Sequence, residues 1–176
     1  SDGMSVRQLD DYAPQVELID EVKVKNTDKQ VLEAMSKSFD KNRLYLSKES
    51  VTLAKAKDSG KIALESNERI SNVDNQRNGN ISFDVNTNRQ RYVLINEYND
   101  GNWTAYVDGK KTDLYKGNYL FRAVNVPSGK HHVELRYEPK VLKVSCIIAG
   151  AGVLLVTGLF LARKSINRKL ETLGGE

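Results

Sequence analysis

Hydrophobic and polar residues alternate through much of the stretch 15–140, which is the pattern of half-buried β-strands. The alternation predicts strands over 15–24, 43–47, 61–70, 80–86, 91–98, 103–109, 119–126 and 131–138. Segment 51–57 also alternates and suits either a strand or a loop. Turn residues separate the later strands, as at Asp108-Gly109, where glycine accepts a positive φ. Short strands at this spacing predict a mainly β fold, a β-sandwich of the jelly-roll or immunoglobulin-like kind.

One short segment has helical spacing instead. Val31, Leu32, Met35 and Phe39 recur on one helical face, after a cap at Thr27 or Asp28. We therefore predict one short amphipathic helix over 27–40. The Asn-rich stretch 72–80 is predicted to be a loop.

The pattern changes near the C-terminus, where the run 144–162 carries no charge. At a rise of ~1.5 Å per residue, such a run spans ~28 Å as a helix, close to the hydrocarbon core of a bilayer. Its glycines are ordinary in membrane helices. The run predicts a single C-terminal transmembrane helix, and the alternative is a buried helix of a soluble protein.

Cations follow this run at Arg163, Lys164, Arg168 and Lys169. By the positive-inside rule, we expect a cytoplasmic tail and an extracytoplasmic N-terminal domain in the cell membrane. The predicted division begins with a flexible N-terminus over 1–14 and the extracytoplasmic domain over 15–140. The transmembrane helix over 144–162 and a basic tail over 163–176 follow. Residues 1–3, before Met4, suit a tag remnant.

Composition narrows the function classes. The formal net charge is +4, and the tail supplies half of it, so the domain is nearly balanced and nucleic acid is not an expected partner. Cys146 is the single cysteine, which excludes a disulfide framework and a cysteine-rich zinc site.

Residues 99–139 carry a specific series of motifs, which ends just before the apolar run. They comprise Trp103, Ala105, Val107, Asp108 and Gly109; then Asn118, Tyr119, Phe121, Arg122, Ala123 and Val124; then Pro127, Gly129, His131, Val133, Tyr137 and Pro139. This series resembles the C-terminal end of the YfhO family of bacterial membrane proteins. The chain departs from the family pattern at Asn102 and Leu135, and neither change harms a strand.

The resemblance implies a function for the parent protein. Members of the family look like multi-pass GT-C-type glycosyltransferases that use polyprenyl-phosphate-linked sugars outside the cytoplasmic membrane, some of them to modify cell-wall polymers such as lipoteichoic acid. In that fold the catalytic acid lies in an early loop with no counterpart here. The chain is therefore expected to be non-catalytic by itself, with the lipid bilayer, a cell-wall polymer or a polyprenyl-phosphate sugar as partners. The alternative is a stand-alone single-pass surface protein with a binding or scaffold module.

The residues themselves indicate no catalytic or metal site, and no cofactor is expected. Glu97, Asp100 and Asp108 are close in sequence, but a glycosidase needs two carboxylates across a cleft, and solvated turn residues explain them better. His131 and His132 are neighbours on one predicted strand, so their side chains point to opposite faces.

Sugar or polymer binding is the better functional candidate. Aromatic rings stack on sugars, and the plausible set is Trp103, Tyr106, Tyr115, Tyr119 and Arg122. For Trp103, packing in the core is the alternative to sugar binding. Its side chain shares a strand face with small apolar residues, so the role of a core anchor is favoured.

Arg122 occupies an otherwise apolar strand face, so it needs a partner. Asp108 or Asp113 would pair with it structurally, and a polymer phosphate would do so functionally. The structural pair is the favoured interpretation.

Overall fold

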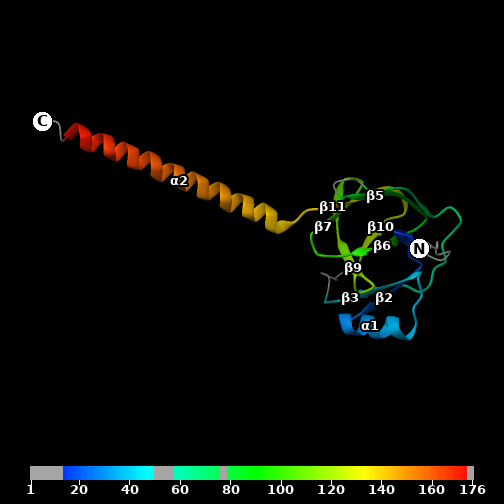
Figure 1. Ribbon diagram of the computed structural model, residues 1–176. Coiled ribbons are helices and arrows are strands. Elements are labelled where there is room, and N and C mark those ends of the chain that lie inside the picture. The colour runs from blue at the N-terminus through cyan, green and yellow to red at the C-terminus, as the bar shows by residue number, and fades with distance from the viewer. Residues whose placement is uncertain (1–13, 50–57, 76–78, 174–176) are drawn as a thin grey trace, which may run out of the picture. The chain divides into compact units, whose positions relative to one another are not determined.

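A computed structural model describes residues 14–49, 58–75 and 79–173. The chain divides into two compact units, Ser1–Glu138 and Pro139–Glu176. The first unit is mainly β, with two sheets and one short helix, as the alternation predicts (Figure 1). The predicted flexible N-terminus, apart from Pro14, and the ambiguous segment 51–57 lie outside the described residues.

The described strands fall into a six-stranded sheet A and a five-stranded sheet B. In chain order they are β1 (Val16–Leu18), β2 (Glu21–Lys25), β3 (Arg43–Ser47), β4 (Arg69–Asn75), β5 (Ile81–Thr87), β6 (Arg91–Tyr98), β7 (Trp103–Val107), β8 (Lys110–Thr112), β9 (Leu114–Gly117), β10 (Phe121–Val126) and β11 (Gly129–Tyr137). Sheet A has the order β1-β6-β10-β9-β3-β2, and sheet B has the order β4-β5-β11-β7-β8.

Sheet A curls strongly. β1 and β2 stand at opposite ends of its strand order, yet only Ile19 and Asp20 separate them along the chain. The two ends of the sheet must therefore approach each other at this link. The Ile19 amide donates to the Tyr92 carbonyl at 3.0 Å, which ties the link to the start of β6.

Two apolar clusters form the core. The first lies between the sheets and joins inward residues of β1, β6 and β10 with those of β5, β7 and β11, including Val93, Val124, Phe83 and Leu135. The second lies on the other face of sheet A, where the strands curl around it, and includes Leu44 and Leu94. Each such side chain contributes roughly 1.5–3 kcal/mol on full burial.

Helix α1 (Asp28–Lys37) connects the parallel pair β2–β3. The Thr27 hydroxyl accepts from the Gln30 amide at 3.2 Å and caps the helix, and the helix buries Val31. Parallel neighbours need such a crossover. This unit departs from the predicted jelly-roll or immunoglobulin-like arrangement, in which the strands pair antiparallel.

Two strand predictions need correction. The predicted strand 15–24 is broken at Ile19-Asp20, where the chain passes from one end of sheet A to the other. The predicted strand 61–70 is wrong over 61–68, because the carbonyls of Ile62 and Ala63 accept from a side chain, Arg91, instead of a strand. β4 begins at Arg69 and extends to Asn75, into the stretch predicted as a loop. β8 and β9 were not predicted.

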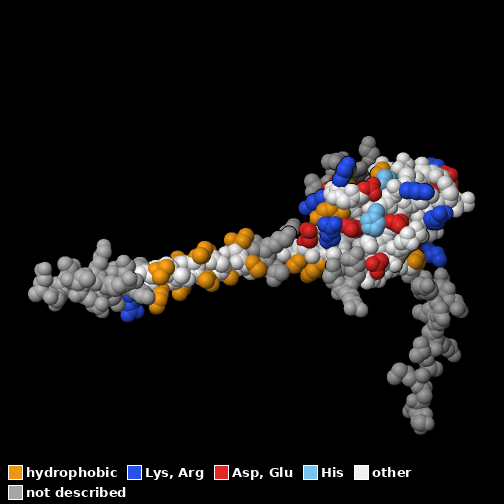
Figure 2. Space-filling view, turned by 90° about the horizontal axis from the view of Figure 1, so that it is seen from above, with side chains coloured by type: hydrophobic (Ala, Val, Ile, Leu, Met, Phe, Trp, Pro, Cys, Tyr) orange, Lys and Arg blue, Asp and Glu red, His pale blue; other side chains and the backbone are white. Residues whose placement is uncertain are grey.

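The second unit contains helix α2 (Lys140–Leu173). Apolar side chains such as Ile147, Leu154 and Phe160 are exposed along it (Figure 2). In the part of the chain that the structure describes, no helix is both long and apolar enough to cross a membrane. The transmembrane helix predicted over 144–162 is therefore contradicted for the described residues.

Candidate functional site

Trp103 and Arg122 come together between the sheets. The guanidinium carbon of Arg122, on β10, lies 3.8 Å from the centre of the Trp103 ring, on β7. Arg122 is 2% exposed, and its Nη2 donates to Oε2 of Glu97 at 2.6 Å. Burial lowers the pKa of the Arg122 guanidinium, and the Glu97 carboxylate opposes that shift. The site is thus a cation stacked on an aromatic face and held by one carboxylate.

The partner of Arg122 is Glu97, and the predicted partners Asp108 and Asp113 do not occupy that place. The register explains the difference, because Arg122 pairs with Ile95 on β6, and Glu97 lies two residues further along the same face. Gln15 donates to the other oxygen of Glu97. Two guanidinium nitrogens of Arg122, Nε and Nη1, are buried without a hydrogen-bond partner among the described residues.

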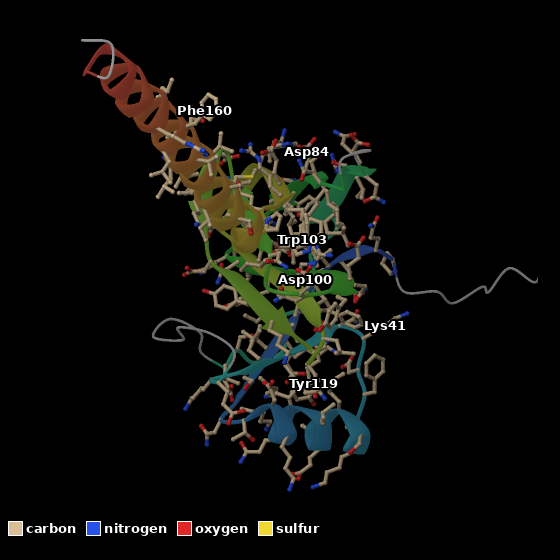
Figure 3. All side chains as sticks on the ribbon, turned by 60° about the vertical axis from the view of Figure 1, so that its left-hand side comes forward. Lys41, Asp84, Asp100, Trp103, Tyr119 and Phe160 are labelled. Atoms are coloured by element: carbon tan, nitrogen blue, oxygen red, sulfur yellow. The ribbon has the colours of Figure 1, made fainter. Side chains whose placement is uncertain are left out.

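The predicted binding residues do not form one site. Tyr106 lies across sheet B from the core, where its hydroxyl donates to Glu138 at 3.2 Å and Arg136 lies 4.4 Å over its ring. Tyr119 lies at the β9–β10 connection with φ of 70°, and Figure 3 places it towards α1, away from Trp103. Tyr115 is buried in the cluster inside the curl of sheet A.

A groove of about 390 Å³ crosses the outer face of sheet B. Its two histidines are paired with carboxylates: His132 Nδ1 lies 2.7 Å from Asp84, and His131 Nδ1 lies 2.7 Å from Asp108. Figure 2 shows this mixture of histidine, acidic and basic side chains on the surface. The hydrogen bond that Asp108 accepts from the His131 ring raises the pKa of His131. These pairings occupy both histidines, and Arg69 and Lys130 complete the charged lining of the groove.

A second pocket, of about 280 Å³, lies where the two ends of sheet A meet. Its lining combines residues of the β1–β2 link, the start of β6, the end of β10 and the segment 58–62. Its polar members are carboxylates, amides, a hydroxyl, a phenol and a guanidinium: Asp20, Asp58, Gln90, Asn125, Ser59, Tyr92 and Arg91. A concave site with a few convergent polar groups is the usual form of a small-ligand site.

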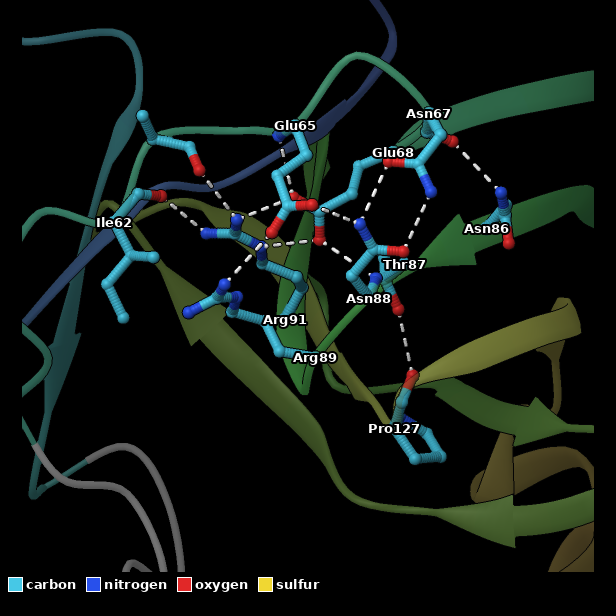
Figure 4. Close-up of polar contacts among 11 residues, drawn as sticks. Ile62, Glu65, Asn67, Glu68, Asn86, Thr87, Asn88, Arg89, Arg91 and Pro127 are labelled. Carbon is cyan, nitrogen blue, oxygen red and sulfur yellow. Dashed lines mark hydrogen bonds and ion pairs between the residues drawn. The ribbon is translucent and has the colours of Figure 1, made fainter.

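Arg91 lines this pocket, and Figure 4 shows its polar contacts. Its Nη1 donates to the Ile62 carbonyl at 2.6 Å, and its Nη2 donates to the Ala63 carbonyl at 3.0 Å. Nε and Nη2 also donate to the two oxygens of Glu68. The hydrogen bonds from Arg91 lower the pKa of the Glu68 carboxyl to about 2. Since all these contacts converge on one side chain, the wall is fixed before any ligand arrives.

The opposite wall is tied to β2. Val22 exchanges two hydrogen bonds with Ser59, its amide donating to the Ser59 hydroxyl at 3.0 Å and its carbonyl accepting from the Ser59 amide at 2.9 Å. The Asp58 carboxylate accepts from the Val24 amide. The Ile62 amide donates to the Asp20 carbonyl at 2.9 Å. The segment 58–62 therefore runs along the edge of β2.

Asp20 lines this pocket and is 8% exposed. Its Oδ1 is buried and has no hydrogen-bond partner among the described residues. Its Oδ2 lies 3.9 Å from Nζ of Lys61, at the limit of an ion pair. An unsatisfied buried carboxylate oxygen is costly, so a ligand that donates to it would bind favourably.

The pocket is suited to binding. Tyr92 and apolar neighbours supply a surface for an apolar ring face. The Gln90 side-chain amide donates to the Asn125 side-chain oxygen at 2.7 Å, so the acceptor Oε1 of Gln90 and the donor Nδ2 of Asn125 are the groups that this pair offers a ligand. Among the described residues, no group of three or more His, Cys, Asp or Glu is placed to hold a metal ion. Sequence reasoning missed this site because four separate segments build it. The one available signal was Asp20, a carboxylate at an apolar position of the alternating stretch 15–24.

Comparisons with known proteins agree with the motifs of 99–139. Residues 14–149 match the model of the family described as bacterial membrane protein YfhO, and the chain belongs to that family. A curated relative, the uncharacterized protein YfhO of Bacillus subtilis (strain 168), is 26% identical over 90 residues. That match covers 51% of this chain and 10% of the relative, so the chain corresponds to a small part of the relative's length. No solved structure matches. The predicted family is confirmed.

Proposed function

We propose that the domain ending at Glu138 is a non-catalytic, extracytoplasmic carbohydrate-binding module of a YfhO-family membrane protein. The parent protein would be a glycosyltransferase that draws on polyprenyl-phosphate-linked sugars. Its acceptor would be a cell-wall polymer of the lipoteichoic acid type, and the module would hold that polymer at the acceptor side. Family membership supports the membrane association of the parent protein.

The observation that carries this proposal is the pocket at the Ile19-Asp20 link. Sugars are bound by stacking of their C–H faces on aromatic rings and by hydrogen bonds to their hydroxyls. Tyr92, Gln90 and Asn125 supply both kinds of contact within about 280 Å³. A volume of this size takes one sugar unit better than a long oligosaccharide, which fits a module that holds a polymer by one residue.

The pocket carboxylates favour binding over hydrolysis. Glycoside hydrolysis uses two carboxyl groups, one as acid and one as base or nucleophile. Asp58 accepts a hydrogen bond from the Val24 amide and so fixes the segment 58–62 on β2. That structural use leaves Asp20 without a second carboxylate free for catalysis.

The proposal is tested by calorimetric titration of the full chain with soluble teichoic-acid fragments. The Tyr92→Ala variant should bind about tenfold more weakly, since aromatic contacts contribute roughly 0.5–1.5 kcal/mol beyond area burial. The control is Tyr98→Ala, which removes a tyrosine that is 66% exposed and does not line the pocket. A wild-type chain that binds no fragment, or equal losses in the two variants, would overturn the proposal.

A further inference from the structure

The charge of the pocket indicates which carbohydrate it takes. Two carboxylates line it, those of Asp20 and Asp58. The one guanidinium in the lining, that of Arg91, is neutralised by Glu68 at 2.6 Å. Lys61 lies 3.9 Å from Asp20 and 3.7 Å from Asp40, and its side chain is 57% exposed, so water screens it and two acids share it. The pocket is therefore net negative.

Asp20 has a carboxylate oxygen without a hydrogen-bond partner among the described residues, and this oxygen narrows the chemistry of the ligand further. An ionised carboxylate is an acceptor only, so a ligand matches Asp20 by bringing a donor to its carboxylate. A hydroxyl brings one donor and no charge, whereas a primary ammonium group brings three donors and a positive charge. Hydrogen bonds between ionised partners are roughly twice as strong as neutral ones.

We propose that the pocket selects carbohydrates that bear a primary ammonium group, with the Asp20 carboxylate as its counter-ion. The inference rests on the proposed carbohydrate-binding function and specifies its ligand. Tyr92 and the amides of Gln90 and Asn125 contact the sugar ring, and Asp20 distinguishes an amino sugar from a neutral or acetylated one. The shared chemistry is an ammonium group beside hydroxyls, which a free small amino alcohol also carries.

The test compares four probes on the full chain by calorimetry: glucosamine, glucose, N-acetylglucosamine and ethanolamine. We expect glucosamine to bind about tenfold more tightly than glucose and N-acetylglucosamine, which corresponds to one charge-assisted contact. Ethanolamine, which lacks the ring, should bind at least as weakly as glucose. In Asp20→Asn, an isosteric change, the preference for glucosamine should fall to within about threefold.

The matched control is Asp40→Asn. Asp40 is the other acid near Lys61, but it does not line the pocket, so this variant should keep the preference. If Asp20→Asn does not fold, NMR titration of the wild-type chain with glucosamine replaces it. The largest amide shifts should then fall on Ile19, Asp20 and Val22, and shifts confined elsewhere would overturn the assignment.

The outcomes separate the two proposals. Equal affinity for glucosamine and glucose overturns the ammonium selectivity and leaves carbohydrate binding intact. Ethanolamine binding as tight as glucosamine binding overturns the role of the ring, and carbohydrate binding fails with it. A chain that binds none of the three sugars and no polymer fragment overturns both.

Discussion

Arg91 and Glu68 form an ion pair that is shut off from water, with Nη2 and Oε2 2.6 Å apart and side chains 3% and 0% exposed. Both carboxylate oxygens accept from Arg91, and two further guanidinium hydrogens reach the Ile62 and Ala63 carbonyls. The pair therefore joins the chain before β4 to the first residue of β6. Since Arg91 also lines the pocket, the proposed ligand binding would depend on the same contacts as stability.

Removing one partner should be strongly destabilising. Glu68→Ala leaves the Arg91 charge buried and uncompensated, and breaking such a pair costs about 3–5 kcal/mol. The free energy of unfolding from urea denaturation measures this. Arg89→Ala is the control, because the Arg89–Glu65 pair is about half exposed and should contribute less than about 1 kcal/mol. Equal losses in both variants would contradict a special role for the buried pair.

The same pair predicts how stability depends on pH. The folded state lowers the Glu68 pKa to about 2 from the ordinary value of 4.5. A group whose pKa falls on folding contributes its full stability above the unfolded pKa and loses it as pH drops towards the folded one. Unfolding free energy should thus decline between about pH 4.5 and 2. Glu68→Gln should flatten this decline, and an unchanged slope would refute the assignment.

Arg122 and Glu97 should respond differently to substitution. Arg122 is buried with two nitrogens lacking partners among the described residues, so Arg122→Met replaces a costly charge with an apolar side chain of similar length. We expect a change of less than about 1 kcal/mol. Glu97→Ala leaves the buried guanidinium without its carboxylate and should destabilise by about 3 kcal/mol. Urea denaturation of both variants checks this contrast, and a larger loss in Arg122→Met would reverse the interpretation.

Gly117 is required by packing inside the curl of sheet A. A Cβ at this position would lie 2.7 Å from Leu44 Cδ1 and 3.0 Å from Leu94 Cδ1. Gly117→Ala should therefore destabilise by about 1–3 kcal/mol through overpacking. Gly60→Ala is the control, since nothing lies within 4 Å of its added carbon. Thermal unfolding of both variants compares them, and a neutral Gly117→Ala would show that the cluster has room.

Alternation predicted most of the strands because it reports local exposure, and 43–47 and 91–98 match β3 and β6. It could not predict the parallel β2–β3 pair or the curl of sheet A, which depend on contacts between distant segments. The segment 61–68 alternates like a strand, but its Ile62 and Ala63 carbonyls accept from the Arg91 side chain. A side chain that donates to backbone carbonyls in place of a neighbouring strand produces no periodic pattern in the sequence.

The candidate site was harder to predict than the fold. Trp103 and Arg122 are close in sequence and do meet, although the partner of the arginine comes from β6. The pocket combines residues as far apart as Asp20 and Asn125, and nothing in their spacing links them. For the apolar run 144–162, the sequence predicted a feature that the structure does not bear out. Its composition predicted a membrane span that no described helix provides.

The short link at Ile19-Asp20 has a consequence for how the chain can be cut. The strands on either side of it cover β6 at one end of sheet A and β3 at the other. A chain that begins after Lys25 would uncover both edges at once. Bare strand edges are templates for pairing with another molecule, so such a truncation should produce self-association as well as a weaker fold.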